Sequence, residues 1–135
     1  VINILNKKSG VLGISGVSSD FRDVQKAQKE GNKRADIAIQ AFVYRVAKYI
    51  GSYVAAMNGV DVICFTAGVG ENGPIVRRII CDNYLEYLGI ELDEEANNKR
   101  GVDIAITTPE SKTVVMSIPT NEELAIARET YALVK

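Results

Sequence analysis

The sequence predicts an α/β fold, and three patterns along the chain support this prediction. The run 61–67 is short and continuously apolar, which is typical of a buried strand. A glycine-rich turn follows it and leads into a helix that begins at Pro74, a residue suited to a first helical turn. Apolar residues at helical spacing predict a long helix over 34–57. This mixture is typical of helices packed on a sheet.

The first thirty residues are predicted to contain two helices separated by an extended segment. Residues 1–8 have the pattern of a helix end, and glycines punctuate an extended stretch over 11–17. A polar helix is expected from Phe21 to Glu30. Either Ser19 or Asp20 can cap its amino end, because a side-chain oxygen there accepts a hydrogen bond from a free backbone N–H.

The helix from Arg34 to Met57 is apolar almost all round and is closed by Asn58-Gly59. Two interpretations stay open for it. It is either an ordinary core helix or a helix shared with a partner subunit.

In the second half of the chain, 61–67 is expected to be a central strand covered on both faces. Thr120 and Glu123 have the spacing of a capping box for the last helix. The total of three strand candidates is below the roughly five that such sheets average, so we expect part of the sheet to be missing. The remaining elements are a short polar helix or loop over 93–100, a strand at 104–106, a turn at 109–112, a strand over 113–118 and a helix after Pro119.

Composition narrows the function classes. The chain has 135 residues, 47% hydrophobic and 24% charged, with a net charge of -1. This balance is typical of a folded, soluble protein and argues against nucleic-acid or membrane-surface binding. Cys64 and Cys81 fit no zinc or disulfide spacing, which predicts buried free thiols and a cytoplasmic location. The chain opens on an apolar segment without Met, which we take as a sign of truncation at the N-terminal side.

The segment Gly68-Val69-Gly70-Glu71-Asn72-Gly73 spells G-x-G-x-x-G between a predicted strand and a helix. Such glycines let a backbone approach a ligand, so a nucleotide is one interpretation. A dinucleotide-binding unit is disfavoured because the region around Glu91 makes a poor second strand. A tight turn without any ligand is the third interpretation. A Walker A loop is excluded, since no Gly-Lys-Ser/Thr follows.

Three segments, taken together, resemble the acetate kinase (acetokinase) family. They are Ser18–Val24, Phe65–Pro74 and Ile118–Arg128, and their order and spacing match the last third of such enzymes. The resemblance implies a ribonuclease-H-like, actin-like ATPase fold, as in acetate and sugar kinases, heat-shock protein 70 and actin. It implies that 1–135 is a partial C-terminal nucleotide-binding domain.

The resemblance also implies an ATP or ADP site. In the family, the triplet matching Asp20, Phe21 and Arg22 borders the adenine and ribose. From the residues alone, Asp20 is a helix cap and Arg22 a solvated charge. The glycine loop packs against the adenosine from the other side, and its matching residues are Gly68, Val69, Gly70, Glu71 and Asn72.

Glu122 matches the magnesium-associated carboxylate of the family, while Glu123 is left as the helix cap. Mg²⁺ accepts one or two carboxylates together with water and phosphate oxygens. No catalytic residue is assigned, because the family's catalytic arginines and histidine belong to the preceding part of the enzyme. The resemblance therefore implies ATP–acetate phosphotransfer, inactivity of this chain alone and a homodimer. Propionate kinase and a pure nucleotide-binding or dimerisation module are the alternatives.

Overall fold

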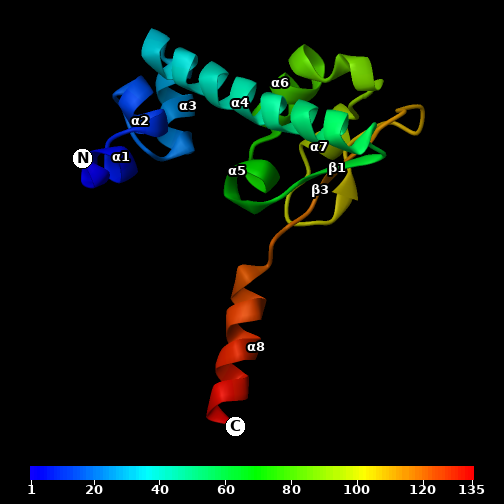
Figure 1. Ribbon diagram of the computed structural model, residues 1–135. Helices are drawn as coiled ribbons and strands as arrows, with labels where there is room; N and C mark the ends of the chain where they lie inside the picture. The colour runs from blue at the N-terminus through cyan, green and yellow to red at the C-terminus, as the bar shows by residue number, and fades with distance from the viewer. The chain divides into compact units, whose positions relative to one another are not determined.

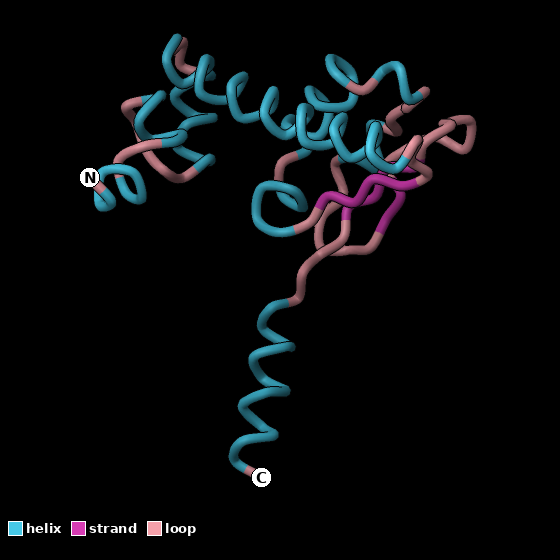
Figure 2. The backbone as a smooth tube through the Cα atoms, viewed as in Figure 1, coloured by secondary structure: helices cyan, strands magenta, loops and turns pink.

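The computed structural model describes all residues from Val1 to Lys135, and the chain forms two compact units. Unit 1 comprises 1–60 and 79–87, and unit 2 comprises 61–78 and 88–135. Helices and a small mixed sheet are both present, which confirms the predicted α/β class (Figures 1 and 2). The structure contains no helix that combines the length and the apolar character needed to cross a membrane.

Unit 1 is built mainly from helices. The expectation of an extended segment over 11–17 was wrong, because Gly10–Ser15 forms helix α2. This helix packs against α4, and such tertiary contact overrides the weak helix propensity of its two glycines. The helices of this unit are α1 (Ile2–Lys7), α2 (Gly10–Ser15), α3 (Phe21–Lys29) and α4 (Lys33–Met57).

The predicted starts of α3 and α4 are confirmed by their caps. The Asp20 carboxylate accepts a hydrogen bond from the backbone N–H of Arg22, and the Asn32 side chain caps α4 in the same way. Both helices pack together around Val24, which is fully buried. The buried residues of α4 end at Ala47, whereas Tyr53 and Met57 near its carboxyl end are more than half exposed.

Unit 2 carries the sheet, whose order is β1–β3–β2. β1 (Val62–Phe65) runs parallel to β3 (Val114–Ser117), while β2 (Ile104–Ala105) is antiparallel to β3. The expectation of a central, fully covered β1 was wrong: β1 pairs with β3 alone, and its residues alternate between exposed and buried. Cys64 is consequently exposed, so the expectation of a buried thiol was wrong there, whereas Cys81 is buried as predicted; neither cysteine forms a disulfide.

The expectation that the glycine-rich segment after β1 is a turn was wrong. The glycine segment is itself a short helix, α5 (Ala67–Asn72), and Pro74 opens the next helix as predicted. The core of unit 2 includes Ile106 and Val115, both fully buried. The remaining elements are α6 (Pro74–Tyr84), which runs from unit 2 into unit 1, the 3-10 helix η1 (Glu86–Leu88), α7 (Glu94–Asn97) and α8 (Glu122–Val134).

Candidate functional site

The parallel strands β1 and β3 end at the same edge of the sheet, and each leads into a helix through a short turn. A non-glycine residue with positive φ stands at the start of each helix: Ala67, the first residue of α5 (Ala67–Asn72), has φ 58°, and Asn121, the cap of α8, has φ 48°. Such backbone conformations cost of order 1–3 kcal/mol and cluster at functional sites. Ligands of open α/β sheets bind outside the carboxyl ends of parallel strands. This edge of the sheet is therefore the expected position of a ligand-binding site.

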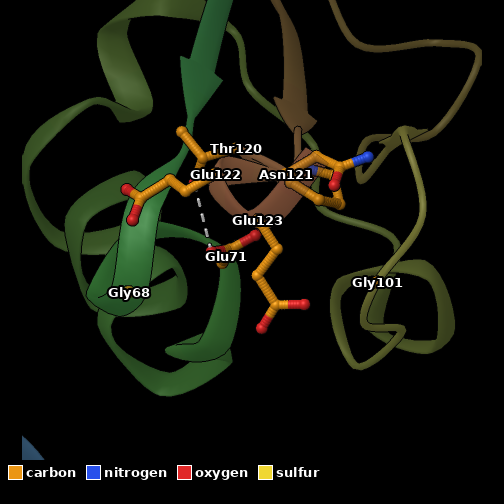
Figure 3. A pocket seen from close by; sticks show the side chains of 8 residues that line it. Gly68, Glu71, Gly101, Thr120, Asn121, Glu122 and Glu123 are labelled. Atoms are coloured by element: carbon orange, nitrogen blue, oxygen red, sulfur yellow. Dashed lines mark hydrogen bonds between the residues drawn. The ribbon is translucent and has the colours of Figure 1, made fainter. Parts of the chain in front are cut away.

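A hollow of ≈ 480 Å³ lies at this edge (Figure 3). Its size lies within the range of sites that hold small molecules. The Thr120 hydroxyl donates a hydrogen bond to the Glu71 carboxylate at 3.4 Å, which joins the turn after β3 to α5. The residues lining the hollow are Gly68, Glu71, Gly101, Pro119, Thr120, Asn121, Glu122 and Glu123.

The three glycines of the G-x-G-x-x-G segment lie in different surroundings. A Cβ at Gly70 would stand 3.3 Å from the carbonyl carbon of Phe65, and one at Gly73 would stand 2.5 Å from the carbonyl oxygen of Val69. Packing alone therefore explains these two. A Cβ at Gly68 would meet nothing within 4 Å, and Gly68 lines the hollow. Gly68 is thus the glycine of this segment with open space in front of it.

Three carboxylates line the hollow: Glu71, Glu122 and Glu123. Hard oxygen ligands of this kind suit Mg²⁺ when phosphate oxygens and water complete the coordination. These three carboxylates do not form a group that could hold a metal ion by itself, so phosphate oxygens and water would have to complete such a shell.

The expected capping box at α8 was wrong. The helix begins at Glu122, its N-terminal cap is Asn121, which has a positive φ, and no side chain caps it by a hydrogen bond. The hydroxyl of Thr120 bonds Glu71 instead of the backbone of Glu123. Glu123 therefore lines the hollow beside Glu122.

In unit 1, Asp20 and Arg22 form a local ion pair at the start of α3. The guanidinium NH2 group donates to Oδ2 of Asp20 at 2.6 Å, and Nε donates to both carboxylate oxygens at 3.1 and 3.2 Å. The hydrogen bond from the Arg22 side chain, helped by that from its backbone N–H, lowers the pKa of Asp20 from 3.8 to about 2. The same bond raises the pKa of Arg22. Asp20 therefore orients an arginine side chain that is 89% exposed.

Phe21, the middle residue of the triplet, contacts the ring of Phe42 edge-to-face, with the ring centroids 4.6 Å apart. Phe21 therefore anchors α3 on α4, a role that the sequence did not indicate. The triplet lies in unit 1, whereas the glycine segment and Glu122 lie in unit 2.

Among the predicted site residues of unit 2, the structure brings Gly68, Glu71 and Glu122 together around one hollow. Val69, Gly70 and Asn72 belong to α5 but do not line that hollow. Gly101, which lies at φ 70° between α7 and β2, was not among the predicted site residues. An isolated glycine ahead of a short strand was its only signal.

Comparisons with known proteins show the family of the chain. The model of the acetokinase family matches residues 1–128. The acetate kinase of Pseudothermotoga lettingae is 56% identical over 135 residues, which is 100% of this chain and 33% of that protein. The crystal structure of Porphyromonas gingivalis acetate kinase superposes with a TM-score of 0.85 at 48% identity and covers 99% of this chain and 34% of that one.

A propionate kinase structure from Francisella tularensis is also similar, with a TM-score of 0.81, 40% identity, and coverage of 95% of this chain and 32% of that one. The chain spans about a third of the length of the relatives that it matches. These neighbours confirm the fold expected from the resemblance. Their agreement over nearly every residue shows that the chain belongs to the acetokinase family.

Proposed function

We propose that this chain is the adenosine-binding, C-terminal part of a kinase that transfers the γ-phosphoryl group of ATP to acetate, and back from acetyl phosphate to ADP. We call the longer protein the complete kinase. The observation that carries the proposal is the hollow at the carboxyl ends of β1 and β3, where Gly68, Glu71 and Glu122 meet. Catalysis of phosphoryl transfer rests on positioning and charge stabilisation, and this chain contributes to the first.

Each unit, taken by itself, carries residues that we assign to adenosine. The exposed guanidinium plane of Arg22, held by Asp20, is suited to stack on an aromatic base. Gly68 leaves room for a ligand to approach α5. In unit 2, Glu122 is the carboxylate that would hold Mg²⁺ together with nucleotide phosphate oxygens. When bound, Mg²⁺ supplies positive charge that neutralises those phosphates.

The metal assignment is tested by comparing Glu122→Gln with Glu123→Gln in the complete kinase. Both side chains line the hollow and both changes remove one charge, so the pair is matched. We expect the Mg²⁺ concentration for half-maximal activity to rise on the order of 10-fold for Glu122→Gln. Glu123→Gln should change this Mg²⁺ concentration by less than about twofold, because the Glu123 carboxylate lies outside the proposed metal shell. Equal effects of the two changes, or a larger effect at position 123, would contradict the assignment.

The isolated 135-residue chain is expected to have no kinase activity. It offers adenosine contacts and one metal carboxylate, and it contains no histidine. Formation of acetyl phosphate above background by the purified chain would contradict this expectation.

Propionate kinase activity is the second candidate, favoured by the similarity to the Francisella tularensis protein named a propionate kinase. The ratio of kcat/KM for acetate to that for propionate in the complete kinase decides between them.

A homodimer in the cytoplasm is also proposed. The exposed Tyr49, Tyr53 and Met57 of α4 support a subunit contact, and two cysteines that form no disulfide fit a reducing compartment. Sedimentation with and without ATP separates assembly from nucleotide binding, since a pure dimerisation module would assemble without binding ATP.

A further inference from the structure

Arg77 of α6 is an arginine with no exposed surface, and its guanidinium holds two other segments. One terminal nitrogen donates to the backbone carbonyls of Gly70 at 2.6 Å and of Glu71 at 3.0 Å. Nε donates to the side-chain oxygen of Asn97 at 2.9 Å, and the other terminal nitrogen donates to the backbone carbonyl of the same residue. Arg77 thus joins α5 to α7.

The two carbonyls on α5 are groups that need a partner. The last four carbonyls of a helix have no intrahelical donor, and Gly70 and Glu71 fall within the last four residues of α5. A cation at the carboxyl end of a helix is also favoured by the helix dipole. The Arg77 guanidinium therefore caps the carboxyl end of α5, which we call the glycine helix.

Asn97 completes the arrangement. It is fully buried, and its amide nitrogen donates to the carbonyl of Pro74 at 3.1 Å, at the start of α6. Arg77 lies three residues after Pro74 in α6, and its Nε donates to the side-chain oxygen of Asn97. The planar guanidinium presents five donors in a fixed fork, so its partners are held in direction as well as distance.

The cap is connected to the hollow through a single residue. The backbone carbonyl of Glu71 accepts from Arg77, while the Glu71 carboxylate lines the hollow and accepts from Thr120. A shift of α5 at its carboxyl end would therefore move both Glu71 and the open position at Gly68.

We propose that Arg77, together with Asn97, is a positioning residue for the glycine helix: it sets where Gly68 and Glu71 stand toward the nucleotide. This inference rests on the proposed adenosine role of that helix. It assigns Arg77 no contact with ATP, because the described contacts of its guanidinium are with protein groups.

Arg78 is the matched control. It is the next residue of α6, and it also reaches α7, through an ion pair with Glu94. Its side chain is 43% exposed and the described ion pair involves no atom of α5. A lysine at either position keeps the charge and reduces the number of donors. The two changes differ in burial and in the hydrogen bonds that Arg77 makes to α5 and to Asn97.

Steady-state kinetics of the complete kinase give the first test. Arg77→Lys should raise the KM for ATP by about 10-fold, the size of effect seen when hydrogen bonds that support a binding residue are lost. The KM for acetate should change by less than about twofold. Arg78→Lys should leave both values unchanged. Equal rises in both KM values for Arg77→Lys would indicate general loosening and overturn the proposal, as would an unchanged KM for ATP.

Hydrogen exchange without nucleotide gives a second test that needs no activity. In Arg77→Lys, backbone amides of 67–73 should exchange faster, while amides of β3 keep their rate and Arg78→Lys matches the parent protein. Unchanged exchange at 67–73 would overturn the positioning role. If the parent protein makes no acetyl phosphate, the proposed function fails, and the exchange result still decides whether Arg77 holds α5.

Discussion

Replacing Gly68 with alanine should raise stability and weaken ATP binding at once. Gly68 is the second residue of α5, after the cap Thr66, and its φ is not positive. An added methyl would meet no protein atom within 4 Å. Alanine in a helix is favoured over glycine by about 0.5–1 kcal/mol, so the change should stabilise the chain by that amount. The melting temperature should rise by roughly 2–4 °C.

The same methyl would stand at the hollow that we assign to the nucleotide. Inserting a methyl into a filled site costs about 1–3 kcal/mol, and 1.4 kcal/mol corresponds to a factor of ten, so the KM for ATP should rise roughly 5- to 150-fold. The KM for acetate should not change. Opposite signs for stability and affinity are the signature of a position kept as glycine for a ligand.

The assay pairs thermal unfolding of the 135-residue chain, followed by circular dichroism, with kinetics of the complete kinase. Gly70→Ala is the control, because its methyl would press on Phe65 at 3.3 Å and should cancel the gain in melting temperature. A melting temperature for Gly68→Ala as low as that of Gly70→Ala would refute the open-space argument. An unchanged KM for ATP would refute the placement of the nucleotide.

Two further predictions concern the ion pair and the core. Asp20→Asn keeps a helix cap but removes the ionic contact with Arg22, so the KM for ATP should rise about 2- to 6-fold while α3 stays formed, checked by kinetics and circular dichroism. The pKa of Asp20 lies below its ordinary 3.8, so the stability that the ion pair contributes is complete above pH 3.8 and is lost as the pH falls through about 2. An NMR titration of the α3 amides should show this transition in the parent protein and not in Asp20→Asn. Ile106→Ala should lower the free energy of unfolding in urea by about 2–5 kcal/mol, whereas the same change at the exposed Ile2 should lower it by less than about 0.5 kcal/mol.

Local signals predicted most of the fold. Caps and periodicity placed α3, α4 and α6, because these helices are specified by residues a few positions apart. Position in the sheet was not predictable in this way: an apolar run predicts a strand, but the edge place of β1 depends on which strands pair with it. Helix α2 was missed because its stability depends on packing against α4.

Part of the candidate site could be predicted from the sequence, and part depends on the fold. The glycine segment could be recognised from the spacing of its residues, whereas Glu122 was assigned only through the resemblance to the acetokinase family. The structure places Gly68, Glu71 and Glu122 around one hollow. Arg77 was not readable, since an arginine inside an amphipathic helix is ordinarily solvated and its partners at 70, 71 and 97 are brought to it by the fold.

Helix α8 has a thermodynamic consequence for metal binding. Its 13 residues include no buried side chain, and an isolated helix of this length is only marginally stable in water. Its first turn begins with Glu122, the proposed metal carboxylate. Any ligand that binds the ordered first turn better than the frayed one stabilises the helix, and helix formation strengthens that ligand's binding by the same factor. Helix-favouring substitutions far along α8 should therefore tighten Mg²⁺ binding without touching it.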